Sequence, residues 1–305
     1  MNPKLSLSFS QLQHFLAVAD QGSVRAAADA LGLSQPAVSK SLRALETALG
    51  ATLIQRDARG SKLTPPGRLL YSRARLIENE VHRASAEIRD LAGIDGGRIA
   101  IGASAIPSIV LMPRALEQIR KQHRNVFIDV VGGMPSVLLP RLLDGGLDFI
   151  VGPRPGERVP DHIESFPLFT LRGSIVMRSD HPLRHARSID DFAEAEWVLS
   201  SSAAHAESAL HTAYRKKELA AAKVVIRVES LIAAYSIAAE TKYVGILPRY
   251  AAPAETLFNR VLFIDVPELD LVEHYDVFVR RNAQLSKAAS KALSLIRALA
   301  RQLRT

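Results

Sequence analysis

The sequence predicts an α/β protein that begins with a small all-α winged helix-turn-helix and continues through one long helix. Three observations carry this prediction. Two short helices with a tight turn fit residues 23–50, a coiled-coil spacing of apolar residues fits residues 70–91, and short apolar strands alternate with helices from residue 98 onward. Such alternation indicates parallel α/β sheets. At 305 residues, the chain is long enough for two or three domains.

The first two helices are bounded by residues that start and stop helices. Ser23 and Ser34 are good N-caps, and Gly32 and Gly50 can end the helices in the left-handed conformation. The second helix has a buried stripe, because its apolar residues recur at spacings of four, three and four, as Val38, Leu42, Leu45 and Leu49. We therefore expect two packed helices with a tight turn.

The opposite edge of the second helix is polar. A helix fits the major groove of B-DNA, where Gln and Arg can contact base edges while Ser and Lys suit phosphate oxygens. The predicted DNA contacts of the helix pair are Ser23, Arg25, Ser34, Gln35, Pro36, Ser39, Lys40 and Arg43. The alternative is a solvated face on an ordinary helical hairpin, but the caps, the turn glycine and the polar edge together favour a helix-turn-helix.

A basic hairpin is predicted directly after these helices. Residues 52–55 and 62–64 form short extended segments around a turn at residues 57–60. Arg56, Arg59 and Lys62 gather at its tip, where they can contact phosphates or the minor groove. A solvated hairpin tip is the alternative that the sequence leaves open.

Positive charge is concentrated near the N-terminus. The formal net charge is +8, and residues 1–75 contain ten basic and four acidic residues, whereas residues 98–283 are balanced. This distribution fits a nucleic-acid contact in the first part of the chain. Residues 284–305 are also basic, but their apolar positions suit packing, so we interpret that charge as a solvated helix face.

Composition and motif searches argue against several other classes of protein. The chain has no cysteine, which removes disulfides, thiolate metal sites and thiol nucleophiles. No apolar run is long enough to span a bilayer and no secretion signal is evident, so we expect a cytoplasmic protein without a membrane partner. The spacing of His205 and His211 does not suit a helical zinc pair, and no Walker-type loop, dinucleotide-binding motif or nucleophile elbow occurs. We predict no catalytic residue, no metal site and no cofactor.

A long helix follows the hairpin. Thr64 is its expected cap, and Pro65 is tolerated in the first turn. Its apolar residues alternate spacings of four and three, which is typical of a coiled-coil seam, at Leu70, Ala74, Ile77, Val81, Ala84, Ile88 and Leu91. Such a narrow stripe favours a partner helix; packing against the body of the chain is the alternative. Gly93, Gly96 and Gly97 suggest a hinge beyond it.

Residues 15–76 resemble the LysR-type transcriptional regulators. The resemblance rests on the segments AAADALGLSQPAVSKSLRALETALGATLIQR and KLTPPGRLLYSRAR, and later on SDHPL at residues 179–183 and VGILPR at residues 244–249. Ile54 stands where many members have an aromatic residue, at a core position rather than a contact. The resemblance therefore covers nearly the whole chain.

The resemblance implies a domain organisation and partners. It implies a winged helix-turn-helix at residues 1–65, a dimerising helix and hinge at 66–97, and an effector-binding domain like a periplasmic binding protein at 98–305. That domain would have one lobe at about 98–168 with 270–305 and a second at about 169–269, joined by two crossing strands. The implied partners are double-stranded promoter DNA, a small-molecule effector and other copies of the chain in a homotetramer, with RNA polymerase a further candidate.

Hydroxyl groups and an arginine follow the predicted strands of the second part. Ligands of open α/β sheets bind beyond the carboxyl ends of strands. In the family these loops face the cleft between lobes, so the expected effector contacts are Ser104, Met134, Pro135, Ser201, Ser202 and Ser230, with Arg154 as a charge partner. We hypothesise that the effector is a small organic anion. Ordinary helix capping is the alternative role for each serine.

Two other functions stay open at this point. The first is a DNA-binding architectural protein that does not respond to a metabolite, which a ligand-independent DNase footprint would indicate. The second is an enzyme acting on a small acid through the two-lobed part, which turnover of a bound effector would reveal.

Overall fold

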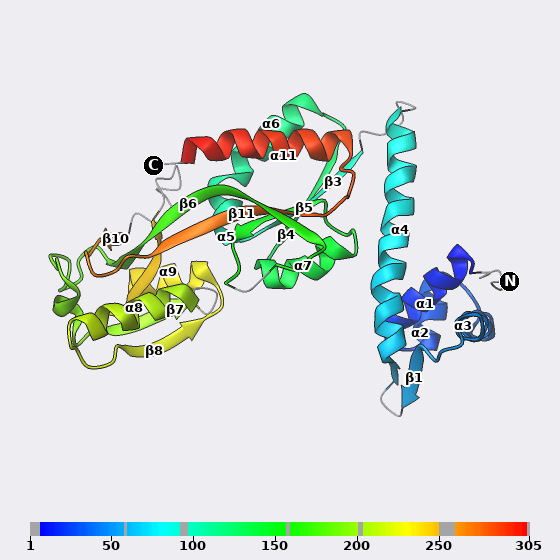
Figure 1. The fold of residues 1–305 in the computed structure, drawn as a ribbon, viewed down its shortest axis with the longest axis horizontal. Helices are drawn as coiled ribbons and strands as arrows, with labels where there is room; N and C mark the ends of the chain where they lie inside the picture. The colour runs from blue at the N-terminus through cyan, green and yellow to red at the C-terminus, as the bar shows by residue number, and fades with distance from the viewer. Residues whose placement is uncertain are drawn as a thin grey trace. The chain divides into compact units, whose positions relative to one another are not determined.

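The computed structural model describes residues 7–57, 60–91, 97–156, 159–200, 204–249 and 260–303. Residues 1–97 with 140–147 form one compact unit, and residues 98–139 with 148–305 form the other. Each unit has its own hydrophobic core. Figure 1 shows the helices of the first unit in blue and cyan and the mixed sheet of the second unit in colours from blue-green to orange.

Three capped helices open the first unit. They are α1 (Phe9–Gln21), α2 (Val24–Leu31) and α3 (Gln35–Leu49). Ser8, Ser23 and Ser34 cap them, each accepting a hydrogen bond from a backbone N–H three residues ahead, and left-handed glycines follow all three helices. The largest buried side chains of this core are Phe15, Leu16, Leu45 and Leu53.

The predicted hairpin is present. Its strands are β1 (Ile54–Asp57) and β2 (Gly60–Leu63), which pair antiparallel with Ile54 opposite Leu63. The Glu46 carboxylate of α3 accepts hydrogen bonds from the backbone N–H groups of Leu53 and Ile54, at 2.8 and 3.3 Å. The recognition-type helix and the hairpin are therefore tied together at the point where β1 begins.

The long helix α4 (Pro65–Leu91) begins where the sequence places it. The Thr64 hydroxyl accepts a hydrogen bond from the Gly67 N–H at 3.1 Å and donates one to the Thr52 carbonyl at 2.6 Å. Leu70 and Ala74 of the predicted seam pack into the core of the first unit. Further along, Ile77, Val81 and Ile88 are 44%, 42% and 67% exposed, so this part of the seam has no cover within the described chain.

One sheet runs through the second unit. Its strands in the described residues are β3 (Arg98–Ala103), β4 (Phe127–Gly132), β5 (Phe149–Pro153), β6 (Ile163–Arg178), β7 (Glu196–Ser200), β8 (Lys223–Val228), β9 (Val244–Arg249), β10 (Val261–Ile264) and β11 (Val272–Arg280). They lie in the order β4-β3-β5-β11-β6-β9-β7-β8, and β10 pairs with β6. The outer strands of each half are parallel, whereas β6 and β11 are antiparallel to their neighbours.

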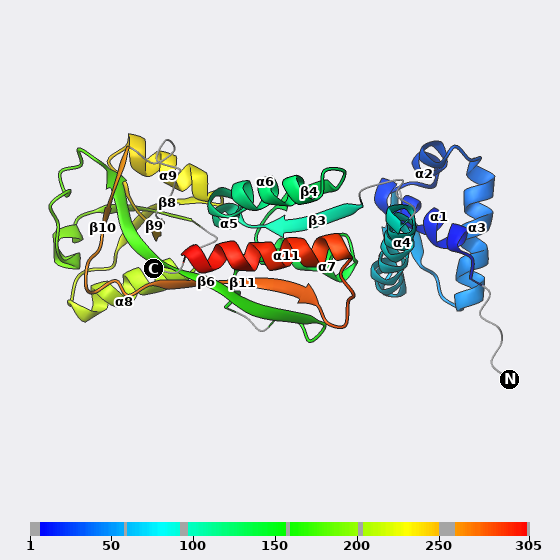
Figure 2. The ribbon, with the colours of Figure 1, turned by 90° about the horizontal axis from the view of Figure 1, so that it is seen from above.

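The two halves of this sheet are two lobes joined by β6 and β11. The helices are α5 (Ala105–Val110), α6 (Met112–Gln122), α7 (Pro135–Leu143), α8 (Ala204–Lys216), α9 (Leu231–Glu240) and α11 (Lys287–Ala300), with short 3₁₀ helices η1 (Ile189–Phe192) and η2 (Arg301–Leu303). In the first lobe, α6 and α11 lie side by side over one face (Figures 1 and 2).

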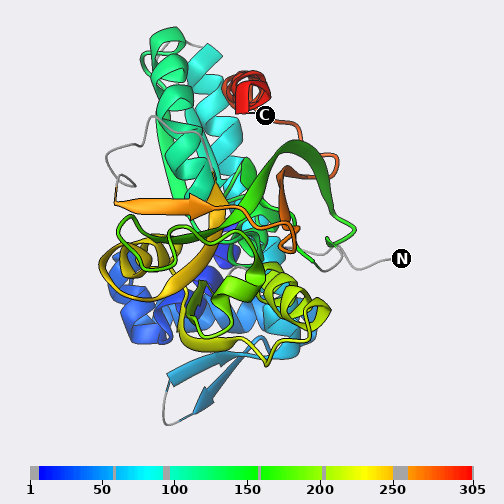
Figure 3. The same cartoon turned by 90° about the vertical axis from the view of Figure 1, so that its left-hand side faces the viewer.

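In the second lobe, α8 and α9 cover opposite faces of the sheet. Ile175 and Met177 of β6 pack in the core with α8, while Val176 between them packs with Tyr235 of α9. This alternation follows from the period of two along a strand. Figure 3 views this lobe end-on. The Trp197 indole N–H donates to the Tyr214 hydroxyl at 3.0 Å inside the α8 core.

Local sequence signals mark two strands incompletely. The apolar run at residues 174–177 indicates only the end of β6, whereas the strand spans residues 163–178. Pro167 and the exposed Phe166 in its first half break the alternation that marks a half-buried strand. The other is β10, a four-residue strand that no local signal indicates and that pairs with β6 in the described part of the chain.

Candidate functional site

One edge of α3 faces solvent and is polar. Gln35, Lys40 and Arg43 are exposed, while Val38, Leu42 and Leu45 on the other edge are at most 3% exposed. The predicted contacts Ser34 and Pro36 are exposed as well, and Ser39 is half-buried. The structure thus brings together the side chains that the sequence assigned to this edge.

Two contacts that the sequence did not reveal hold α3 in place. One is formed by the Glu46 carboxylate, which accepts hydrogen bonds from the backbone at the start of β1. The other joins the Nδ1 atom of His14 on α1 to the Ser41 hydroxyl at 2.8 Å. Both residues lie inside ordinary amphipathic helices, where no sequence signal separates them from solvated polar positions.

The hairpin rests on the turn between α1 and α2. The Ser61 N–H donates to the Gly22 carbonyl at 2.8 Å. Gly60 has φ +126°, and a Cβ there would lie 2.8 Å from the same carbonyl oxygen, so only glycine suits this position. Lys62 of β2 and Arg25 of α2 are exposed, and the Ser23 hydroxyl is the α2 cap. The prediction for Arg59 lies outside the described residues, and only the backbone of Arg56 is described.

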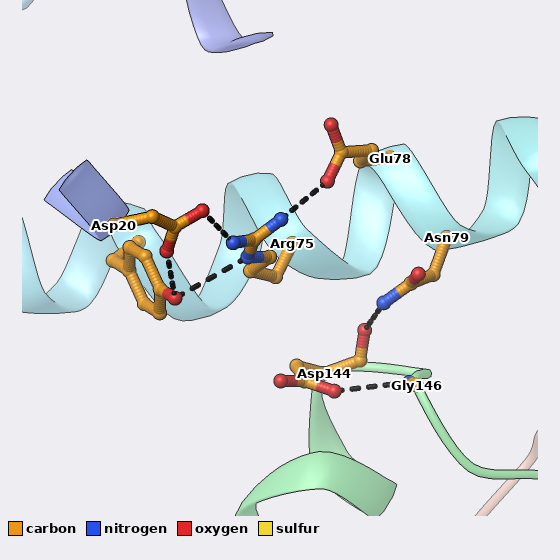
Figure 4. A network of polar contacts seen from close by, with 7 residues as sticks. Asp20, Arg75, Glu78, Asn79, Asp144 and Gly146 are labelled. Atoms are coloured by element: carbon orange, nitrogen blue, oxygen red, sulfur yellow. Dashed lines mark hydrogen bonds and ion pairs between the residues drawn. The ribbon is translucent and has the colours of Figure 1, made fainter. Parts of the chain in front are cut away.

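A polar network ties α4 to α1 (Figure 4). Arg75 of α4 forms ion pairs with Asp20 of α1 and, at 2.7 Å, with Glu78. The Tyr71 hydroxyl donates to Asp20 at 2.7 Å. Burial, followed by the hydrogen bond to Asp20, raises the pKa of Tyr71. The start of the long helix is therefore fixed to the helices that carry the polar edge.

The second unit contains a cavity of about 650 Å³ beyond the carboxyl ends of β3 and β5. Four predicted effector contacts line it: Ser104, Met134, Pro135 and Arg154. Ser230 is not among the lining residues; its hydroxyl caps α9 by accepting from the Ala233 N–H at 3.3 Å. The predictions for Ser201 and Ser202 lie outside the described residues.

Ser104 presents a buried hydroxyl to the cavity. The residue is 3% exposed and stands before α5, but its side chain makes no capping hydrogen bond. Its Oγ atom has no hydrogen-bond partner in the described part of the chain. A buried polar atom of this kind is rare and calls for a ligand or a water molecule. Gly152 leaves room beside it, since a Cβ there would lie 2.8 Å from Pro135 and 3.5 Å from the Ser104 Oγ.

The charge of Arg154 is already compensated within the protein. Its Nε and Nη2 atoms donate to both carboxylate oxygens of Asp276 at 2.8 and 3.0 Å, and the Asp276 side chain is 1% exposed. The hydrogen bonds that Asp276 accepts raise the pKa of Arg154. Two of the five guanidinium N–H donors are thus engaged. Arg154 therefore offers N–H donors to the cavity, while the Arg154–Asp276 pair as a whole carries no net charge.

Strand β11 adds polar groups to the cavity that the sequence did not reveal. Glu273, His274 and Tyr275 line it, together with His205 of α8. The Tyr275 hydroxyl donates to Glu273 at 2.8 Å, and its ring stacks on Phe169 with centroids 4.7 Å apart. Burial raises the pKa values of both Glu273 and Tyr275. The apolar alternation of this strand begins at Tyr275, so the sequence does not mark Glu273 as part of it.

Two kinds of feature are absent from the described residues. They contain no helix with the length and apolarity needed to cross a membrane. They also contain no group of three or more His, Cys, Asp or Glu side chains placed to hold a metal ion.

Known proteins match the chain along nearly its whole length. The family model described as bacterial regulatory helix-turn-helix protein, lysR family, matches residues 9–68, and the LysR substrate binding domain matches residues 92–301. The HTH-type transcriptional regulator GbpR of Azospirillum brasilense is 28% identical, covering 97% of this chain and 87% of the relative. The SDS degradation transcriptional activation protein of a Pseudomonas strain is 30% identical, covering 94% of each.

Solved structures share the fold. Full-length CbnR in complex with its target DNA has a TM-score of 0.69 at 19% identity, covering 97% of this chain and 99% of that one. A full-length OxyR variant from Pseudomonas aeruginosa has a TM-score of 0.65 at 18% identity, covering 98% of this chain and 96% of that one. The fold class predicted from the sequence is confirmed. With an N-terminal winged helix-turn-helix and a two-lobed substrate-binding domain, the chain belongs to the LysR family and is a DNA-binding transcriptional regulator, not an enzyme.

Proposed function

We propose that α3 lies in the major groove of promoter DNA and that its exposed edge contacts the duplex. The observation that carries this proposal is the division of α3 into an exposed edge with Gln35, Lys40 and Arg43 and a buried apolar edge. Gln35 and Arg43 are assigned to base edges and Lys40 to phosphate. Supporting contacts are assigned to Ser23, Arg25, Ser34, Pro36 and Ser39, with Arg56, Arg59 and Lys62 on the hairpin.

Two substitutions separate base contact from phosphate contact. Arg43→Ala is expected to cost about 1 to 3 kcal/mol at the preferred site and to blunt discrimination between sequences. Lys40→Ala is expected to weaken binding to all sequences alike and to lower the salt slope by about one. The probes are DNA fragments that the wild-type chain selects from the sheared genome of its own organism, measured by fluorescence anisotropy at several salt concentrations.

Thr47→Ala is the control, since Thr47 is exposed on the last turn of α3, one turn beyond Arg43, and is not among the assigned contacts. It is expected to bind like the wild type. Unchanged affinity in both the Arg43 and the Lys40 variants would remove α3 from the DNA interface.

We further propose that α4 pairs with α4 of a second copy. Ile77, Val81 and Ile88 form the uncovered part of the seam, and burying them against a partner helix is favourable. A two-fold dimer would place two heads on half-sites of an interrupted palindrome. Pairing of second units would join two dimers into a tetramer in the cytoplasm, where effector binding changes how the dimers are arranged on DNA and how RNA polymerase is engaged.

The oligomer proposal is tested at Ile88. Ile88→Glu places a charge in the seam and is expected to reduce the mass found by light scattering, because burying an unpaired carboxylate is costly. Ser85→Glu, on the exposed surface of the same helix, is the control and should keep the wild-type mass. An unchanged mass for the Ile88 variant would exclude α4 from the interface.

The effector is proposed to bind in the cavity of the second unit as a small carboxylic acid. Support comes from the unpartnered Ser104 hydroxyl, the remaining donors of Arg154 and the apolar walls formed by Met134 and Pro135. Ser104→Ala is expected to weaken ligand binding and to leave DNA binding without ligand unchanged. A DNase footprint that responds equally to ligand in both proteins would exclude this cavity as the effector site.

A further inference from the structure

One side of the cavity carries a carboxylate, Glu273, to which an organic anion without a donor group cannot form a hydrogen bond. Glu273 lines it, and the only hydrogen bond described for its carboxylate is the one that Tyr275 donates. A carboxylate has room for about four hydrogen bonds in all. Glu273 therefore has acceptor capacity left within a largely apolar cavity.

The charge of Glu273 is not balanced by the arginine that lines the cavity with it. Arg154 is neutralised by a bidentate pair with Asp276, which is not a lining residue, so among these three described groups the Glu273 carboxylate is the formal charge left over. His205 lies near enough to influence the pKa of Glu273, and His274 lines the same cavity. Burial raises the pKa of Glu273, as expected for a carboxylate that lacks sufficient polar partners.

The donor groups and Glu273 lie at different places in the cavity. Ser104 follows β3, and Glu273 lies on β11, with β5 between these strands. Two strand spacings separate their backbones by about 10 Å. A ligand that meets both sets needs two different polar groups.

We propose that the effector is a small carboxylic acid that also carries an amino or hydroxyl group, which donates a hydrogen bond to the Glu273 carboxylate. This inference rests on the proposed effector site and specifies its ligand class. The acid group lies toward Ser104 and Arg154, and the donor group lies toward Glu273. Pro153, Leu231 and Pro248 supply apolar contacts to the ligand body between them.

A plain carboxylic acid is disfavoured by the same groups. Any acid meets repulsion from the Glu273 carboxylate in a site of low dielectric, and a plain acid has no donor group whose hydrogen bond to Glu273 would offset it. It would also leave the acceptor capacity of Glu273 unused. A site built to accept a hydrogen bond discriminates against an analogue that lacks the donor, because the buried polar group then has no partner.

Matched ligand sets test the proposal on the full-length protein by calorimetry. One set is 3-phenylpropanoate, 3-phenyllactate and phenylalanine; the others are the plain, hydroxy and amino forms of benzoate and of butanoate. In at least one set, the hydroxy or amino form is expected to bind about 10- to 100-fold more tightly than the plain acid. In Glu273→Gln this preference is expected to shrink to a few-fold, with the plain acid bound as well as before or better.

Glu117→Gln is the control, because Glu117 is an exposed glutamate of α6 that pairs with Lys121 and lies outside the cavity lining. It should keep the wild-type preference. Thermal melts establish that each variant is folded. Equal or tighter binding of the plain acids in every set, no binding by any probe, or a preference that survives in Glu273→Gln would overturn the proposal.

A further variant separates this inference from the effector site itself. If Ser104→Ala weakens all bound probes while no donor preference exists, the cavity is the effector site and only the ligand class is wrong. If Ser104→Ala changes the affinity of no probe, the proposed effector site is wrong as well.

Discussion

The first unit and the cavity of the second unit treat polar side chains in opposite ways. In the first unit, the inward-facing polar groups are paired, as in the Arg75 network and the His14 to Ser41 hydrogen bond, and the groups assigned to DNA face solvent. In the cavity, the buried Ser104 hydroxyl is left without a partner. A DNA-contacting surface needs rigid support for its exposed groups, whereas a ligand site needs buried polar groups that can still form hydrogen bonds to the ligand.

The support of the DNA-contacting surface is most sensitive at Gly67. A Cβ there would lie 2.0 Å from the backbone carbonyl oxygen of Leu53, so Gly67→Ala must displace the start of α4 from the hairpin. We expect a loss of about 3 kcal/mol or more for the first unit, together with lost DNA binding, although no assigned contact is changed. Scanning calorimetry measures the loss.

Gly132→Ala is the matched control for this prediction. No atom lies within 4 Å of a Cβ at Gly132, and its φ is not positive. It should therefore change stability by no more than about 0.5 kcal/mol. Equal stability of the two variants would show that α4 is not tightly seated on Leu53.

The paired network of the first unit predicts a smaller effect. Arg75→Ala removes the partner of Asp20, Glu78 and Tyr71 at once and should cost about 1 to 3 kcal/mol. Arg73→Ala, at an exposed position of the same helix, is the control and should cost at most about 0.5 kcal/mol. Chemical unfolding measures both, and a smaller loss for Arg75 than for Arg73 would contradict the role given to the network.

The smallest effects are expected at two glutamates of the second unit, whose pKa values are shifted in opposite directions. Burial acts to raise the pKa of Glu268, but hydrogen bonds, led by the one from Lys217, lower it from 4.5 to about 2. Its stabilising contribution is complete above pH 4.5 and is lost as the pH falls toward 2. Glu268→Gln should therefore lower the melting temperature at neutral pH, and the difference from wild type should shrink across that window.

Glu273 is expected to behave in the opposite sense. Because its pKa is raised in the folded protein, folding favours its protonated form, and its ionisation costs stability as the pH rises through the folded pKa. Glu273→Gln should raise the melting temperature of the ligand-free protein at neutral pH, with a smaller gain at acid pH. The change in melting temperature relative to wild type should thus depend on pH in opposite ways for Glu268→Gln and Glu273→Gln. The same pH dependence in both variants would contradict the opposite pKa shifts of the two carboxylates.

Local signals in the sequence predicted some features and missed others for physical reasons. Serine caps, left-handed glycines and the stripe from Val38 to Leu45 are determined within a few residues, so α2 and α3 were predictable. Ser104, which lines the cavity, could be singled out because it follows a buried strand. Glu273 was missed because its role depends on β11 lying between β5 and β6, a pairing of residues about a hundred positions apart in sequence. The neighbouring strand with which it forms hydrogen bonds determines where such a strand begins, and the local composition does not.

The two lobes are joined by β6 and β11, which pair antiparallel along residues 163–172 and 272–280. A change in the angle between the lobes therefore has to bend or twist this two-stranded connection. Its register shifts between Tyr275 and Asp276, and Tyr275 lines the cavity. A ligand in the cavity would thus lie against the connection itself, where its regular ladder is interrupted.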